Sequence, residues 1–142
     1  MKTVLITGTS SGIGRATAVA AAEAGWTTIA TMRDLDRAGP LREASVDIRR
    51  LDVTDAASIA DCLDGVRQTY GQLDAVVNNA GIANFDPTME MSTMDNLRDN
   101  LEVNFFGVVA VSRAAMPLLR ASRGRLLTIG SVHGVVGQPF NE

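Results

Sequence analysis

The sequence predicts an α/β fold in which helices cover both faces of one doubly wound parallel sheet. Short runs rich in β-branched residues alternate with longer stretches of helical period, which is the pattern of consecutive strand–helix–strand units. The first of these runs leads directly into a glycine-rich turn at residues 7–14. A chain of 142 residues, 46% of them hydrophobic, is long enough to bury one core. We therefore expect a single domain over residues 1–142.

Five strands are expected, and helices fill the intervals between them. The β-branched runs predict strands near residues 3–7, 27–31, 47–51, 73–78 and 125–130. Helical periodicity predicts helices over residues 13–24, 34–43 and 55–70, and a long pair over roughly 92–122.

Capping residues mark the ends of these helices. Asp55 and Ser92 stand where N-caps are expected, and Gly25, Gly71 and Gly124 stand where helices should end. Parallel strands joined by right-handed crossovers leave a crevice at the carboxyl edge of the sheet, at the point where the strand order reverses. We expect the ligand to lie in that crevice.

The composition argues against several kinds of partner and site. The net charge is −3 and the Lys and Arg residues are scattered, so no nucleic acid is expected. No apolar run approaches membrane-spanning length and no signal segment is recognised, so we expect a cytoplasmic protein with no membrane partner. The single cysteine, Cys62, cannot form an internal disulfide, and with no His or Cys cluster beside it no metal site is expected.

The glycine-rich turn has the composition of a phosphate-binding loop. It follows the first predicted strand, opens a helix and has the spacing Gly-x-x-x-Gly-x-Gly. Glycines allow a tight turn and close approach of a pyrophosphate, whose charge would be met by free amides at the positive helix end. The alternative is a purely structural turn, which this strand–turn–helix context disfavours. The residues expected to bind a dinucleotide here are Gly8, Ser10, Ser11, Gly12, Ile13 and Gly14.

The end of the second predicted strand indicates which dinucleotide is bound. An acid at this place would bind the ribose 2'-hydroxyl of NAD, but the chain has Met32 followed by Arg33. A guanidinium can hold a phosphate by paired hydrogen bonds, so NADP(H) is preferred over NAD(H). The alternative is a solvated Arg33 paired with Asp34 or Asp36 on the surface.

Two further polar residues stand where chemistry could take place. Asn104 has apolar neighbours within a predicted helix, where an amide needs a hydrogen-bond partner; it could merely satisfy a backbone carbonyl at a helix distortion. Ser131 follows the fifth strand at the carboxyl edge, where its hydroxyl could bind a substrate oxygen; taken alone, it is a turn residue.

These blocks together resemble the classical short-chain dehydrogenase/reductase family. The resemblance is carried by Thr7 to Gly14, Asp52-Val53, Asn78-Asn79-Ala80-Gly81, Asn104 and Ile129-Gly130-Ser131, which occur in the family's order. The stretch from Gly130 to Asn141 is also similar to the hydroxysteroid and retinol dehydrogenase subgroup. The fold implied is a Rossmann-like sheet, here truncated after about five strands.

The resemblance implies roles for the matching residues. Asp52 and Val53 would lie along the adenine ring, although Asp52 could also be a helix N-terminal acid, with Asp55 as its competitor. A structural role is implied for Asn78, and a cofactor-facing one for the three residues after it. Asn104 would hold a water that relays protons, and Ser131 would bind the substrate oxygen. The cofactor-facing residues implied by this block are Asn79, Ala80 and Gly81.

The implied reaction is hydride transfer between NADP(H) and a carbonyl or secondary alcohol of a small, apolar substrate. Family members use a Tyr and a Lys four residues later, and neither is present: Tyr70, the only tyrosine, is followed at that spacing by Asp74. We therefore expect a parent enzyme and no activity from these 142 residues alone. The alternative is a non-catalytic nucleotide-binding fragment or pseudoenzyme. The long helix resembles one used in family oligomers, so a homo-oligomer is expected of a complete chain.

Overall fold

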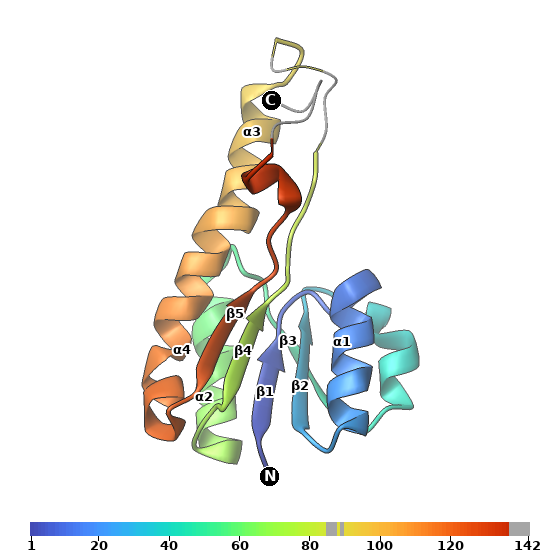
Figure 1. The fold of residues 1–142 in the computed structure, drawn as a ribbon, viewed down its shortest axis with the longest axis vertical. Helices are drawn as coiled ribbons and strands as arrows, with labels where there is room; N and C mark the ends of the chain where they lie inside the picture. The colour runs from blue at the N-terminus through green and yellow to red at the C-terminus, as the bar shows by residue number, and fades with distance from the viewer. Residues whose placement is uncertain (85–87, 89, 137–142) are drawn as a thin grey trace.

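The computed structural model describes residues 1–84, 88 and 90–136, and it confirms the α/β class. Five parallel strands form one sheet in the order β3-β2-β1-β4-β5 (Figure 1). The chain fills one side of β1 first and then crosses to the other, so the strand order reverses between β1 and β4. The strands are β1 (Thr3–Ile6), β2 (Thr27–Met32), β3 (Val46–Arg50), β4 (Ala75–Asn78) and β5 (Arg125–Thr128).

Alternating side chains of the strands build two cores, one on each face of the sheet. All four residues of β1 are buried; Val4 and Ile6 belong to one core and Leu5 to the other. Helices α1 (Gly12–Glu23) and η1 (Leu35–Arg42) contribute residues to the first core, and α2 (Ala56–Tyr70) and α4 (Val108–Ser122) to the second. Figure 1 shows α1 on the opposite side of the sheet from α2 and α4. This is the doubly wound arrangement that the alternating pattern predicts.

The capping predictions are partly confirmed. Asp55 caps α2, because its carboxylate accepts from the N–H groups of Ala57 and Ser58. Gly71 ends α2 in the left-handed conformation, with φ of 75°. The prediction for Ser92 is wrong: Thr93 is the N-cap of α3 (Met94–Leu101), and its hydroxyl accepts from the Asn96 N–H.

Two other helix predictions need correction. Arg123, with φ of 57°, ends α4 in the left-handed conformation expected of Gly124. Gly124 comes one residue later, where a Cβ would lie 2.6 Å from the Leu73 carbonyl oxygen. The helix expected over 34–43 is instead the 3-10 segment η1, interrupted at Gly39, where φ is 33°, just before Pro40. A short 3-10 segment, η3 (Val132–Gly134), follows β5.

The long helical pair forms one continuous run. Helix α3 passes through a π-helical segment, η2 (Glu102–Gly107), into α4. By length and composition the run Met94–Ser122 could cross a membrane, and 22% of its most apolar window is buried. The expectation that no apolar run approaches membrane-spanning length is therefore wrong on those two criteria, because the two predicted helices join end to end. The α4 part packs one face in the core through Val111, Ala115, Leu118 and Leu119.

Candidate functional site

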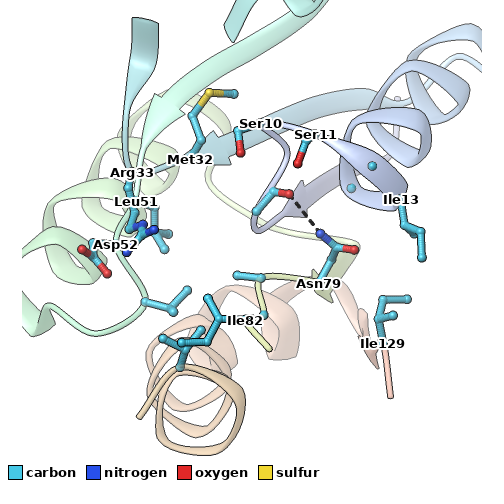
Figure 2. A pocket seen from close by; sticks show the side chains of 17 residues that line it. Ser10, Ser11, Ile13, Met32, Arg33, Leu51, Asp52, Asn79, Ile82 and Ile129 are labelled. Carbon is cyan, nitrogen blue, oxygen red and sulfur yellow. Dashed lines mark hydrogen bonds between the residues drawn. The ribbon is translucent and has the colours of Figure 1, made fainter. Parts of the chain in front are cut away.

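A cavity of about 480 Å³ opens at the carboxyl edge of the sheet, between the ends of β1, β2 and β4 (Figure 2). All twelve residues expected to contact a cofactor line this cavity, so the structure brings together segments from residue 8 to residue 81. Five further lining residues were not predicted as site residues: Met32, Leu51, Ile82, Val103 and Ile129. Four of these are apolar residues of the kind that fill protein cores, and their sequence pattern does not distinguish them from packing residues. The fifth, Met32, was considered only because it stands where an NAD-binding acid would be expected.

The glycine turn is held close to the end of β4. Gly8 has φ of 70°, and a Cβ there would lie 2.7 Å from the Cα of Ala80. A Cβ on Gly14 would lie 2.3 Å from Asn79 Nδ2 and 2.5 Å from the Gly8 carbonyl oxygen. Side chains at these two positions would push the turn away from β4. The turn is therefore bare backbone at Gly8 and Gly14, which leaves room for a ligand to approach its amides.

The N-terminus of α1 opens at the same cavity. Ser11 is the N-cap, with extended backbone angles, and its side chain makes no capping hydrogen bond. The first amides of a helix lack intrahelical partners and carry the positive end of its dipole. Ser11, Gly12 and Ile13 all line the cavity. This helix end can accept an anion where a capping side chain would otherwise compete.

Thr7 joins the glycine turn to β4 through its hydroxyl. Its Oγ1 accepts hydrogen bonds of 3.0 Å from the N–H groups of both Asn79 and Ala80. The Asn79 side-chain amide donates to the Thr7 carbonyl oxygen at 2.9 Å. It also donates to the Gly8 carbonyl oxygen at 3.1 Å (Figure 2). Thr7 was not among the residues predicted to build the site, since its partners lie more than seventy residues away along the chain.

Replacing Thr7 with valine should lower the free energy of unfolding by about 2 kcal/mol, because it removes the acceptor shared by two backbone N–H groups while keeping the side-chain shape. Urea denaturation would measure this. Thr9→Val is the matched control: Thr9 is equally buried, but its hydroxyl only donates to the Thr31 carbonyl, which also accepts the Thr9 N–H. Equal losses in the two variants would contradict the role assigned to the Thr7 oxygen.

One end of the cavity carries opposite charges. Figure 2 shows Arg33, Leu51 and Asp52 on one side, and Ile13 and Ile129 on the other. Burial alone would raise the pKa of Asp52, but hydrogen bonds from the Thr54 N–H and hydroxyl, with the charges of Arg33 and Arg50, hold that pKa below its ordinary value. Asp52 is therefore a carboxylate, able to accept a hydrogen bond at this end of the cavity.

Arg33 is available to a ligand. Among the residues that the structure describes, the ion pairs within 4.0 Å do not include Arg33. Asp34 instead caps η1, accepting from the Asp36 N–H at 3.0 Å. The alternative in which Arg33 is paired with either of these two aspartates is thus not the arrangement found. The guanidinium is exposed beside the cavity and free to meet an anion.

The two residues expected to serve catalysis lie beside the cavity rather than in its lining. Asn104 is exposed within the π-helical η2, and its amide holds the backbone of Ile82: Nδ2 donates to the carbonyl at 2.7 Å and Oδ1 accepts from the N–H at 2.9 Å. Its side chain therefore satisfies backbone groups at a helix distortion, which was the alternative considered for it. Ser131 is exposed two residues after Ile129, which lines the cavity.

Tyr70 and Asn78 have structural roles in this arrangement. The Tyr70 hydroxyl donates to Asp47 at 2.9 Å, away from the cavity, and burial together with that carboxylate raises its pKa. Asn78, which is 2% exposed, donates to the Ser112 hydroxyl at 2.9 Å and so ties β4 to α4. Gly137 to Asn141, part of the subgroup resemblance, lie outside the described residues.

Comparison with known proteins agrees with this geometry. A family model described as short chain dehydrogenase matches residues 2–142. Retinol dehydrogenase 8 of Bos taurus is 36% identical over 154 residues, covering 99% of this chain and 48% of that protein. Human 17-beta-hydroxysteroid dehydrogenase type 1 is 39% identical over 152 residues, covering 98% and 45%. The chain thus spans about half the length of the curated relatives it matches.

A solved structure extends the likeness to the fold. The X-ray structure of an alcohol dehydrogenase from the archaeon Thermococcus sibiricus, complexed with 5-hydroxy-NADP, superposes with a TM-score of 0.91 at 30% sequence identity. The match covers 99% of this chain and 62% of that one.

Proposed function

This chain belongs to the short-chain dehydrogenase family, and from that premise we propose that it is the nucleotide-binding part of an oxidoreductase that transfers hydride between NADP(H) and a carbonyl or secondary alcohol. The observation that carries the proposal is the cradle of bare backbone at Gly8 and Gly14, beside an uncapped helix end. Such a cradle suits the pyrophosphate of a dinucleotide, and a cavity of about 480 Å³ gives the ligand room.

The lining residues fit the parts of a dinucleotide in order. The pyrophosphate would meet the amides at residues 8–14, and Asp52 would accept a hydrogen bond from the adenine amine while Val53 packs on the ring. The ribose and nicotinamide would lie along residues 79–81, where Gly81 carries no side chain to keep them away. When bound, the cofactor supplies the hydride at its nicotinamide ring.

NADP(H) is proposed in preference to NAD(H). The support is the exposed, unpaired Arg33 at the cavity end beside Asp52, and Met32 in place of a carboxylate that would repel a 2'-phosphate. The archaeal alcohol dehydrogenase that superposes on this chain is complexed with 5-hydroxy-NADP, a ligand of the same class.

The chemical step needs groups that orient the substrate oxygen and move a proton. We assign the first role to the Ser131 hydroxyl, beyond the apolar end of the cavity marked by Ile129. The side chain of Asn104 is already hydrogen-bonded to the backbone of Ile82. We therefore assign the second role to the backbone of Asn104, which lies in the π-helical segment and would bind a water molecule that relays protons. The described residues place no tyrosine at the cavity, so nucleotide binding without turnover is the second candidate function.

In a complete enzyme, Ser131→Ala should lower kcat about 100-fold while changing the dissociation constant of NADPH less than twofold, because the hydroxyl would contact the reacting oxygen and not the cofactor. Steady-state kinetics and NADPH fluorescence would measure the two effects. Ser45→Ala, at an exposed residue outside the cavity lining, is the control for loss of a hydroxyl. Unchanged turnover would remove Ser131 from the proposed site.

Association and location complete the proposal. We propose that the protein self-associates, because apolar side chains on α3, η2 and α4 are exposed, including Leu101, Phe105 and Phe106. We also propose a cytoplasmic location. Light scattering would test association: a molar mass equal to one protomer at micromolar concentration would reject it.

A further inference from the structure

The segment that follows β4 is held to the long helix by two side-chain amides that act alike. Asn104 binds both backbone groups of Ile82, as described above. Asn100, one helical turn earlier, does the same to Asn84: its Oδ1 accepts from the Asn84 N–H at 3.1 Å and its Nδ2 donates to the Asn84 carbonyl at 3.1 Å. Each amide presents a donor and an acceptor to a backbone edge, as a neighbouring strand would.

The spacing of the two pairs follows from simple geometry. Four residues advance about 6 Å along an α-helix, and two residues advance about 6.6 Å along an extended chain. Asparagines four apart on the helix therefore match alternate residues of a segment that runs in the opposite direction. In Figure 1 the chain leaves β4 and runs beside α3. We call these two pairs, Asn104 with Ile82 and Asn100 with Asn84, the amide ladder.

The amide ladder fastens two walls of the cavity to each other. Ile82 from the segment and Val103 from η2 both line the cavity. Figure 2 shows Ile82 between the side of the cavity that carries Asp52 and the side that carries Ile129. Gly81 lets the two elements approach, since a Cβ there would lie 3.3 Å from Asn104 Oδ1. A shift of Asn84 away from the helix would carry Ile82 with it and change the shape of the cavity.

We propose that Asn100 is a positioning residue that, through Asn84, holds segment 82–84 as the cavity wall between the charged end and the end where an apolar carbonyl substrate binds. The assignment of that end to the substrate rests on the proposed function, because it follows from placing the adenine at the opposite, charged end. The amide ladder does not depend on the proposed function, because it consists only of the hydrogen bonds of Asn100 and Asn104.

Amide hydrogen exchange followed by NMR tests the ladder directly. Asn100→Ala should speed exchange of the Asn84 N–H about fivefold or more and leave the N–H of Val76, in the buried strand β4, unchanged. Asn100→Asp keeps an acceptor and should retain protection of the Asn84 N–H. Asp99→Ala, at an exposed neighbour on α3, is the control. Unchanged exchange at Asn84 in Asn100→Ala, or equal acceleration at Val76, would overturn the proposal.

Kinetics test the positioning role, with acetophenone as the apolar ketone. In Asn100→Ala of the complete enzyme we expect KM for the ketone to rise about fivefold, with kcat and the dissociation constant of NADPH within twofold of the unsubstituted enzyme. An unchanged KM, or an NADPH affinity that falls in parallel, would contradict the role. If the unsubstituted protein binds no NADPH, the proposed function and the substrate assignment fail together, whereas exchange at Asn84 still decides whether the ladder holds.

Discussion

Replacing Gly14 with alanine is expected to weaken NADPH binding about 100-fold, equivalent to about 2.7 kcal/mol. The added Cβ would lie 2.3 Å from Asn79 Nδ2 and 2.5 Å from the Gly8 carbonyl oxygen. Asn79 already donates to that carbonyl and to the carbonyl of Thr7, so it cannot withdraw without losing both hydrogen bonds. The glycine turn must therefore move away from β4, and the backbone amides that would meet the pyrophosphate move with it.

Fluorescence titration with NADPH measures this loss, at a temperature where circular dichroism shows that the variant is folded. Gly134→Ala is the matched control, because Gly134 has no positive φ and an added Cβ would meet no atom within 4 Å. We expect the control to bind NADPH as the unsubstituted protein does. A folded Gly14→Ala variant with undiminished affinity would show that the cradle is not where the pyrophosphate binds.

Arg33→Ala is expected to weaken NADPH binding about 30-fold or more and NADH binding less than twofold. The two dinucleotides differ only in the 2'-phosphate, and a charge-assisted pair of hydrogen bonds from a guanidinium contributes about 2 kcal/mol or more. Nearby Asp52 makes the discrimination sharper, since without Arg33 its carboxylate would repel the 2'-phosphate.

The control for Arg33 is Arg37→Ala. Arg37 is also exposed, lies four residues along the chain in η1 and is not part of the cavity lining, so its removal changes net charge by the same amount. Competition titrations with both dinucleotides separate a local from a general charge effect. If Arg33→Ala lowers the affinities for NADPH and NADH equally, the preference for NADP(H) is not set by this residue.

Much of the fold could be predicted from the sequence because local signals agreed with the global arrangement. Strands β1 to β4 contain short β-branched runs, and neighbouring residues of β1 such as Leu5 and Ile6 bury on opposite faces of the sheet. Strand β5, with the sequence Arg-Leu-Leu-Thr, has one β-branched residue and is exposed. The N-cap at Asp55 could also be predicted, because this acid immediately precedes helix α2. At Ser92 and Thr93 two adjacent hydroxyl residues compete, and only the three-dimensional structure separates them.

The site divides in the same way between local and long-range information. The glycine turn was visible because its spacing and its strand–helix context are contiguous in the chain. The roles of Thr7 and Asn100 were not visible: each hydroxyl or amide finds its partners far along the chain, in backbone groups that carry no side-chain signature. The π-helical segment around Asn104 was likewise hidden, since helical periodicity continues through it.

The central claim is that this cavity binds NADP(H), and an NMR titration of the protein with NADPH tests it most directly. We expect a saturable shift of the backbone amides of Gly8, Gly12 and Gly14, with the side-chain resonances of Arg33 following the same dissociation constant. Saturable binding that leaves those glycine amides unshifted, or no binding at millimolar NADPH, would contradict it.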